Sequence, residues 1–257
     1  MTVKAMDMSG LGGHRTHRDL AGLWRRALLL WGVFALAASL AMAPTLAAMV
    51  TVWWNSATFN HGLLIPFIIA WLVWDRRKTL AQVRPGLYPL GLIPMAGALM
   101  LWLLGRVGDV QMVQQFGWVF LMQFSVLTLL GLAATRALLF PLGYMLFLVP
   151  FGEFLIPPLQ HFTAQFIVAG LQTLDIPVFL EDVFLSTPSG DFEVAQACSG
   201  VRFLIATLAL GVLFANISFK SWRRRAVVVA LAVIVPIIAN GLRAFGIVYI
   251  AYLTDNE

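Results

Sequence analysis

The chain has little cysteine and little charge, and each shortage excludes a class of protein. Cys198 is its single cysteine among 257 residues, so an internal disulfide framework is excluded and the one thiol is free for chemistry. Charged residues make up 11% of the sequence and hydrophobic residues 60%, with a mean hydropathy of +0.86. Such a composition is too apolar for an ordinary soluble domain. The sequence therefore predicts a polytopic membrane protein.

Several apolar stretches approach the length of about 20 helical residues that crosses the hydrocarbon core of a bilayer. They are residues 27–50, 62–74, 87–104, 116–133, 137–156, 199–217 and 226–252. We therefore expect an all-α polytopic membrane protein with about seven transmembrane helices. Residues 1–25 are expected to be a cytoplasmic N-terminal tail, and residues 26–257 one transmembrane domain, with no second soluble domain.

The net charge of +5 is concentrated in short basic clusters. They lie at the ends of apolar runs, at residues 25–26, 76–78 and 223–225. Basic residues in such places anchor the chain on the cytoplasmic side, so we do not expect a nucleic-acid partner. This orientation places residues 51–61, 105–115 and 157–198 outside.

The outer stretch 157–198 is the longest interruption between the apolar runs, and a loop of that size is usually functional. Apolar residues recur at helical spacing over 159–174 among polar ones, which predicts an amphipathic helix at the outer face. Residues 187–191 (TPSGD) form a turn signal, and the alternation that follows predicts a short extended segment leading to Cys198.

Cys198 lies where this polar loop becomes a membrane helix, which makes it a candidate nucleophile. A helix N-terminus favours the thiolate over the thiol, and Arg202, four residues on, shares its helical face. Two alternatives remain open. Cys198 can be a small buried hydrophobe, and Arg202 can pair with Glu193 or Asp191 or extend to the membrane surface.

Arg243 is the second candidate, because an arginine within a membrane helix usually faces a polar cavity or partner. Eighteen residues separate it from Arg225, or about 27 Å of helix, so it is expected near the outer end of its span. Asn240 shares its face and can orient it. We expect the thiol and the guanidinium to reach the same depth from adjacent antiparallel spans, a constellation suited to acyl transfer.

Cysteine hydrolases usually also contain a histidine. His61 lies on the first outer loop and His161 on the amphipathic helix, so both are on the expected side of the membrane. Neither has a carboxylate close by in the sequence, and each is also compatible with an ordinary interfacial histidine.

With these residues identified, the chain resembles the exosortases, bacterial relatives of the archaeosortases. Residues 197–202 (ACSGVR) resemble the family's cysteine motif, and residues 240–244 (NGLRA) its asparagine-x-x-arginine motif. Residues 60–66, 150–153 and 187–190 resemble further family segments.

The resemblance implies a membrane cysteine protease and transpeptidase that needs no cofactor. Its substrates would be exported proteins with a C-terminal signal of three parts: a Pro-Glu-Pro-type motif, a transmembrane helix and a basic tail. Cys198 matches the nucleophile that forms an acyl-thioester, and Arg243 the proposed proton donor. The enzyme would lie in the inner membrane of an exopolysaccharide-producing Gram-negative bacterium, with its site facing the periplasm, and would transfer proteins to a cell-surface acceptor.

The family's third catalytic residue is a histidine near the start of a further helix, and this chain ends fourteen residues after Arg243. We therefore expect the sequence to be a fragment that lacks its last helix. Neither His61 nor His161 is assigned to that role.

Two other classes of function stay open. A small-solute transporter would use Arg243, Asn240 and Pro236 at a broken helix as its binding site. A scaffold for polysaccharide export would retain Cys198 only as a filler of its core.

Overall fold

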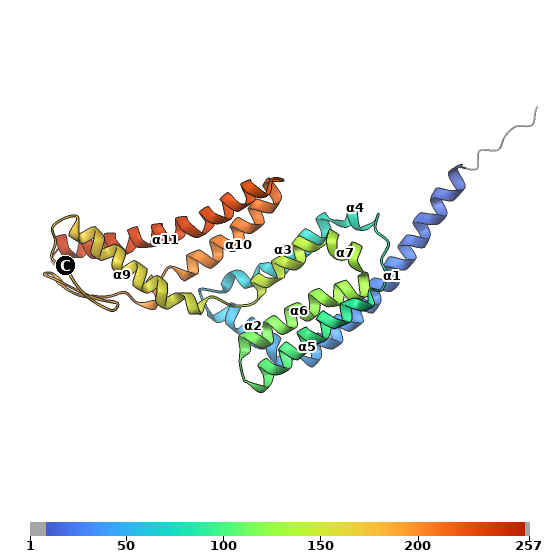
Figure 1. The fold of residues 1–257 in the computed structure, drawn as a ribbon, viewed down its shortest axis with the longest axis horizontal. Coiled ribbons are helices and arrows are strands. Elements are labelled where there is room, and N and C mark those ends of the chain that lie inside the picture. Colours follow the sequence, from blue (N-terminus) through green and yellow to red (C-terminus); the bar gives the residue numbers. More distant parts are fainter. Residues whose placement is uncertain (1–8, 255–257) are drawn as a thin grey trace, which may run out of the picture. The chain divides into compact units, whose positions relative to one another are not determined.

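The computed structural model describes the backbone of residues 9–254 and the side chains of residues 20–254. The chain is mainly helical, as the sequence predicted (Figure 1). Part of the expected N-terminal tail, residues 1–8, lies outside the described residues. Contacts divide the chain into two compact units. Unit 1 comprises residues 1–54 and 62–150, and unit 2 comprises residues 55–61 and 151–257.

Helices of unit 1 vary widely in length. The longer ones are α1 (Ser9–Ala41), α2 (Ala43–Asn55), α3 (Ile65–Asp75), α5 (Leu92–Val107) and α6 (Gln111–Leu130). Shorter helical turns are α4 (Arg77–Leu80), η2 (Pro89–Gly91), α7 (Leu132–Ala137), α8 (Leu139–Tyr144) and η3 (Met145–Leu148), and η1 (Asn60–Leu63) has two residues in each unit. Polar side chains inside this unit bond to one another: Nε1 of Trp31 donates to Oγ of Ser125 at 3.0 Å. Such pairing is required where lipid leaves no water to satisfy polar groups.

Unit 2 combines helices with a small sheet. Its helical elements are η4 (Glu153–Leu155), α9 (Ile156–Gln172), η5 (Gln196–Cys198), α10 (Val201–Ser218) and α11 (Trp222–Leu253). Strands β1 (Phe179–Glu181), β2 (Phe184–Thr187) and β3 (Gly190–Glu193) form an antiparallel sheet in the order β1-β2-β3. Of these strands the sequence predicted only β3. The hairpin of β1 and β2 was missed because its turn contains Asp182 in a left-handed conformation (φ 58°), which has only a weak sequence signal.

Helices α10 and α11 form an antiparallel hairpin joined by residues 219–221. Helix α11 has 32 residues, which corresponds to about 48 Å and exceeds the hydrocarbon thickness. It continues for ten residues beyond Arg243, so the arginine is not at the end of its helix.

The last part of α11 packs against α9 and the sheet. Their shared core is formed by Ala164, Ile167, Leu171, Ile176, Leu185, Val194, Ala244 and Val248. Gly170 permits this close approach, because a Cβ atom there would lie 2.6 Å from the ring of Phe245. The site at the start of α10 therefore has a packed support on one side.

Six helices of the described chain are long and apolar enough to cross a membrane. They cover Leu20–Ala41, Pro89–Val107, Gln111–Leu130, Glu153–Gln172, Gln196–Ser218 and Trp222–Leu253, and two shorter apolar helices cover Ile65–Asp75 and Leu139–Leu148. The class of fold is thus confirmed, while individual spans differ from the expectation of about seven.

Two of those differences have a physical reason. The expected span 27–50 is divided between α1 and α2 just before Pro44, which has no N–H to donate within a helix. The expected span 137–156 is interrupted after residue 148, where Pro150 and Gly152 (φ 121°) follow. The expected amphipathic helix 159–174 is α9, which has the length and composition of a candidate span.

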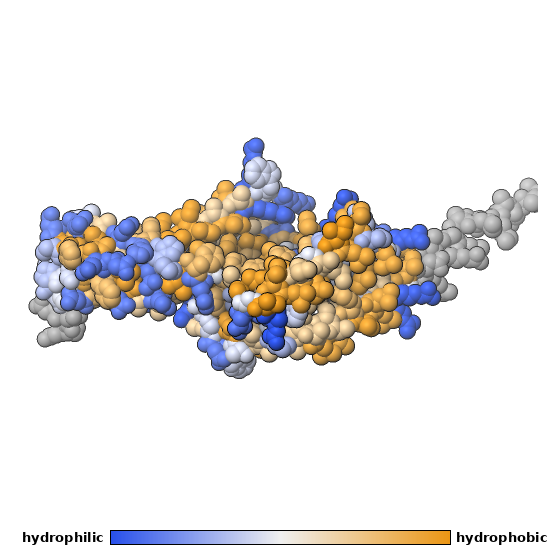
Figure 2. All heavy atoms as spheres, turned by 60° about the horizontal axis from the view of Figure 1, so that its bottom comes forward, coloured by the Kyte–Doolittle hydropathy of each residue, from blue (hydrophilic) through white to orange (hydrophobic). Residues whose placement is uncertain are grey.

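Large apolar side chains remain exposed on the described surface, as lipid contact requires. Figure 2 shows hydrophobic residues, in orange, over much of the visible face. Phe67 and Ile93 are 74% and 72% exposed. Apolar surface of this extent is rare on soluble monomers, so the fold is that of a multi-pass membrane protein.

Candidate active site at the start of α10

Cys198 is the last residue of η5, and α10 begins three residues later at Val201. We expected Cys198 in the first turn of that helix, and this was wrong, because Gly200 adopts a left-handed conformation (φ 80°) and separates the two elements. A Cβ atom on Gly200 would also lie 2.7 Å from Cγ of Asn240. Only glycine fits both the turn and the close approach of α11.

Asn240 connects the cysteine turn to two helices. Its side chain is 4% exposed, and its Nδ2 donates to the carbonyl oxygen of Cys198 at 2.7 Å. The same nitrogen lies 3.4 Å from Oγ1 of Thr163 on α9. The residues of the cysteine motif and of the asparagine-x-x-arginine motif are thus in direct contact.

Cys198 lines a small cavity. The side chain is half-buried and packs against the core shared by α9, the sheet and α11. The cavity has a volume of about 80 Å³ and is lined by Ile167, Leu185, Phe192, Glu193, Val194, Cys198, Ala244, Ile247 and Val248. Apart from Glu193 and Cys198, the residues that line it are apolar.

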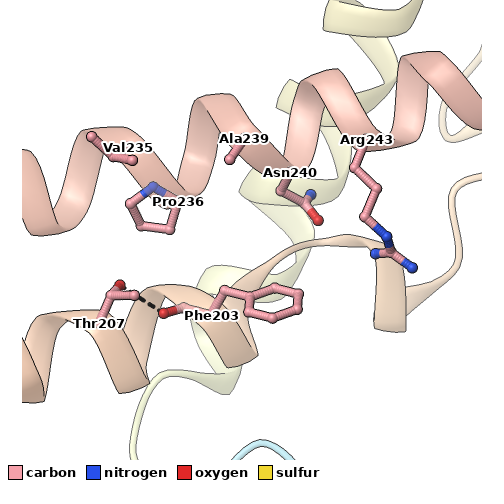
Figure 3. Close-up of a pocket in the computed structure, with 7 residues that line it drawn as sticks. All are labelled: Phe203, Thr207, Val235, Pro236, Ala239, Asn240 and Arg243. Atoms are coloured by element: carbon pink, nitrogen blue, oxygen red, sulfur yellow. Dashed lines mark hydrogen bonds between the residues drawn. The ribbon is translucent and has the colours of Figure 1, made fainter.

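Arg243 lines a different and larger cavity, between α10 and α11. Its volume is about 340 Å³, and Figure 3 shows the residues around it: Phe203, Thr207, Val235, Pro236, Ala239, Asn240 and Arg243. Among the described residues no hydrogen bond or ion pair joins Arg243 to Cys198. The structure therefore joins the two motifs through the Asn240 side chain and the Cys198 backbone, while Cys198 and Arg243 line separate cavities.

Arg202, the second residue of α10, is exposed. Within the described part of the chain it forms no ion pair with Glu193 or Asp191. One of the alternatives considered for this side chain is thus not formed in the structure.

His61 lies in η1, within the segment 55–61 of unit 2. Its ring is half-buried, with its centroid 6.4 Å from that of Phe59. Burial lowers the pKa of His61 below its ordinary value of 6.5, and a hydrogen bond with the backbone of Thr58 opposes this only in part. The imidazole is therefore neutral at pH 7. In the described residues no hydrogen bond joins it to Cys198 or Arg243.

His161 has a carboxylate partner that the sequence did not indicate. Its Nε2 lies 3.3 Å from Oδ1 of Asp182, in the turn between β1 and β2, and both side chains are exposed. Two residues along α9 rotate a side chain by about 200°, so His161 faces away from Thr163 and hence from Asn240. This pair does not belong to the cysteine turn.

Two polar residues of α9 that contact the site region were not singled out from the sequence. Thr163 adjoins Asn240, and Nε2 of Gln160 donates to the carbonyl of Val194 at 2.8 Å. Their only signal was the polar face of the expected amphipathic helix.

Comparison with known protein families agrees with the family resemblance of the sequence. The family model described as transmembrane exosortase (EpsH) matches residues 53–257, well over half of the chain. No curated protein and no solved structure matches the chain.

Proposed function

Because the chain belongs to the transmembrane exosortase family, we propose that it is a cysteine transpeptidase that cleaves the C-terminal sorting signal of exported proteins. The hydrogen bond from Asn240 to the carbonyl of Cys198 carries this proposal. It places the candidate nucleophile beside the helix that bears Arg243, at an end of α10 where a polar loop meets the membrane.

The proposed reaction has two steps. The thiolate of Cys198 attacks the carbonyl carbon of the scissile peptide, the C–N bond breaks, and the leaving nitrogen takes up the proton that the thiol gave up. Arg243 is positioned on the neighbouring helix to donate hydrogen bonds to the oxyanion or to the leaving group. An acceptor amine, a hydroxyl or water then attacks the thioester, and the thiol of Cys198 is released.

Side chains on both sides of the Asn240 amide take part in this scheme. The thiol lines the smaller cavity, the guanidinium the larger one, and Asn240 lies in the wall of the latter while it contacts Cys198. In this scheme the substrate peptide runs past Asn240, between the two cavities.

Topology supports a periplasmic site in the inner membrane. The basic residues 223–225 begin α11, and Asn240 follows Arg225 by fifteen residues, or about 22 Å of helix. With the basic end inside, the cysteine turn lies toward the outer leaflet. A substrate with a Pro-Glu-Pro-type motif outside, a transmembrane helix and a basic tail inside has the same orientation.

Replacement of Cys198 by alanine tests the proposal directly. The variant is co-expressed with an exported protein that carries such a signal, and the processed and unprocessed forms are separated on gels. We expect full-length substrate to accumulate with Cys198→Ala and mature product with the unchanged chain. Equal processing by both would overturn the role of Cys198.

The half-buried thiol in an apolar cavity is the observation that favours a scaffold instead. Because Cys198 is the only cysteine, a membrane-impermeant maleimide added to spheroplasts reports on this residue alone. A catalytic thiolate is expected to react within minutes at neutral pH. A thiol that stays inert, together with unchanged processing by Cys198→Ala, would support the scaffold.

A further inference from the structure

The larger cavity of unit 2 lies beside the cysteine turn without containing the thiol. Its volume of about 340 Å³ falls in the range of ligand pockets. Apolar groups of Phe203, Val235, Pro236 and Ala239 form most of its wall, and its polar groups, Asn240 and Arg243, project from α11 at one end (Figure 3).

We propose that this cavity binds an apolar side chain of the substrate, from the residues that follow the scissile bond. This inference rests on the proposed function. The ligand is therefore the first part of the sorting signal's transmembrane helix, held in extended form beside α10 and α11.

The cavity begins beside the cysteine turn and follows α11. Nδ2 of Asn240 holds the Cys198 carbonyl at 2.7 Å, so the polar end of the cavity lies one side chain from the cysteine turn. The cavity extends from Arg243 to Val235, eight residues or about 12 Å along α11. It runs toward the basic end of this helix, which is the direction in which the substrate enters the membrane after its cleavage site.

The hydrogen-bonding capacity of the cavity fits a peptide as the occupant. Oδ1 of Asn240 is buried and has no hydrogen-bond partner among the described residues, so it requires a donor. The exposed guanidinium of Arg243 requires an acceptor. A peptide unit offers an N–H and a C=O on one rigid group, which matches a buried acceptor and a donor one helical turn apart.

A small residue in the wall leaves room for a side chain of the substrate. Ala239 lines the cavity and leaves space there, while its neighbour Ile238 is exposed and is not part of the wall. These two positions lie at nearly the same depth on different faces of α11. They provide a matched pair of probes.

Cross-linking of substrate in membranes tests the inference. The Cys198→Ala chain has no cysteine, so Ala239→Cys and Ile238→Cys each introduce a single thiol. Each variant is co-expressed with a substrate that carries one cysteine, placed in turn at the first six positions of its transmembrane helix, and oxidised with copper phenanthroline. We expect a disulfide-linked complex with Ala239→Cys at one or two substrate positions and at least tenfold less with Ile238→Cys. Equal yields, or no complex with either, would overturn the inference and leave the cavity to lipid.

A second measurement separates the cavity from the proposed function. Ala239→Trp fills the cavity, and we expect it to slow cleavage of a substrate with leucine at the cross-linking position at least tenfold, with a smaller effect when that residue is alanine. Ile238→Trp is the control. If the unchanged chain does not cleave, the proposed function fails whatever the cross-links show. If the unchanged chain cleaves, and Ala239→Trp cleaves both substrates at the same rates as the unchanged chain, the cavity inference fails alone.

Discussion

Oγ1 of Thr207 lies 3.0 Å from the carbonyl oxygen of Ala232, the carbonyl that Pro236 leaves without its helical partner. Pro236 is inside α11 and has no N–H to donate to the residue four positions before it. Within lipid no water can take that role. The hydroxyl also lies 2.7 Å from the carbonyl of Phe203 and 3.1 Å from that of Leu204. Its single proton is therefore shared between its own helix and the break in α11.

Thr207→Val should destabilise the α10–α11 hairpin by about 0.6 kcal/mol and by at most about 1.7 kcal/mol, the average and the maximum found for hydrogen bonds between membrane helices. The cause is the loss of the donor to Ala232, and valine preserves the shape of the side chain. In a Pro236→Ala background the effect should shrink, because the new N–H then satisfies that carbonyl. Unfolding of the unchanged chain, the two single variants and the double variant in mixed micelles gives the coupling energy between Thr207 and Pro236.

Thr51→Val is the control for this cycle. The hydroxyl of Thr51 donates at 2.8 Å to Ala47 of its own helix, so its removal tests the local effect without a partner helix. A Thr207→Val loss that is the same with Pro236 and with Ala at position 236 would contradict the role given to this threonine.

Gly200→Ala should abolish processing and destabilise unit 2. The left-handed backbone costs an alanine about 1 to 2 kcal/mol, and the added methyl would overlap the side chain of Asn240. Gly246→Ala on α11 is the matched control, because nothing lies within 4 Å of its Cβ position. Helix propensity predicts that this second change stabilises by about 0.5 to 1 kcal/mol. Processing and thermal melting of both variants provide the comparison.

Much of the region around the candidate site followed from residue types and spacing. An arginine within an apolar run, a glycine after the cysteine and an asparagine one helical turn before the arginine are all local features. Their common level follows from antiparallel helices of similar length on either side of a short turn, 201–218 and 222–240. Because the two lengths match, Asn240 reaches the level of Cys198 and can form the hydrogen bond with its carbonyl.

Side-chain direction did not follow from the sequence, because it depends on contacts between segments far apart in the chain. Gly200 turns the backbone so that the Cys198 side chain packs among Val194, Ala244 and Val248, while Arg243 faces α10. The pairing of β1 with β2 likewise depends on one residue, Asp182, whose left-handed conformation has only a weak sequence signal. The partner of His161 was missed for that reason.

His61 should make the stability of the chain depend on pH on the acid side. Burial lowers its pKa in the folded chain below 6.5, so the unfolded chain binds the proton more tightly. Stability is then fully present above pH 6.5 and falls as the pH decreases toward the lowered pKa. His61→Gln should flatten this part of the profile. Melting temperatures between pH 7.5 and 5 check it, and an unchanged slope would show that other groups set the acid limit.

His161→Gln should leave processing unchanged. The pair with Asp182 is exposed, and exposed ion pairs contribute about 0 to 1 kcal/mol. Asp182→Asn should have the same small effect, and added salt should remove the difference from the unchanged chain. A large loss of processing with His161→Gln, at normal protein levels, would instead assign this histidine to the reaction.

Asn240→Asp tests whether the amide positions the cysteine turn. The change preserves size but replaces the Nδ2 donor with oxygen, so the Cys198 carbonyl loses its partner at a cost of about 1 to 3 kcal/mol. We expect single-turnover cleavage to slow by at least about tenfold, with little change in the amount of uncleaved substrate recovered with the chain. Asn216 lies near the other end of α10, so Asn216→Asp is the matched control and should cleave normally.

Maleimide labelling of Cys198 adds a readout that a general loss of stability would not give. At temperatures well below melting, the labelling rate should change in Asn240→Asp and remain that of the unchanged chain in Asn216→Asp. Normal cleavage and normal labelling in Asn240→Asp would show that the turn holds its position without this hydrogen bond.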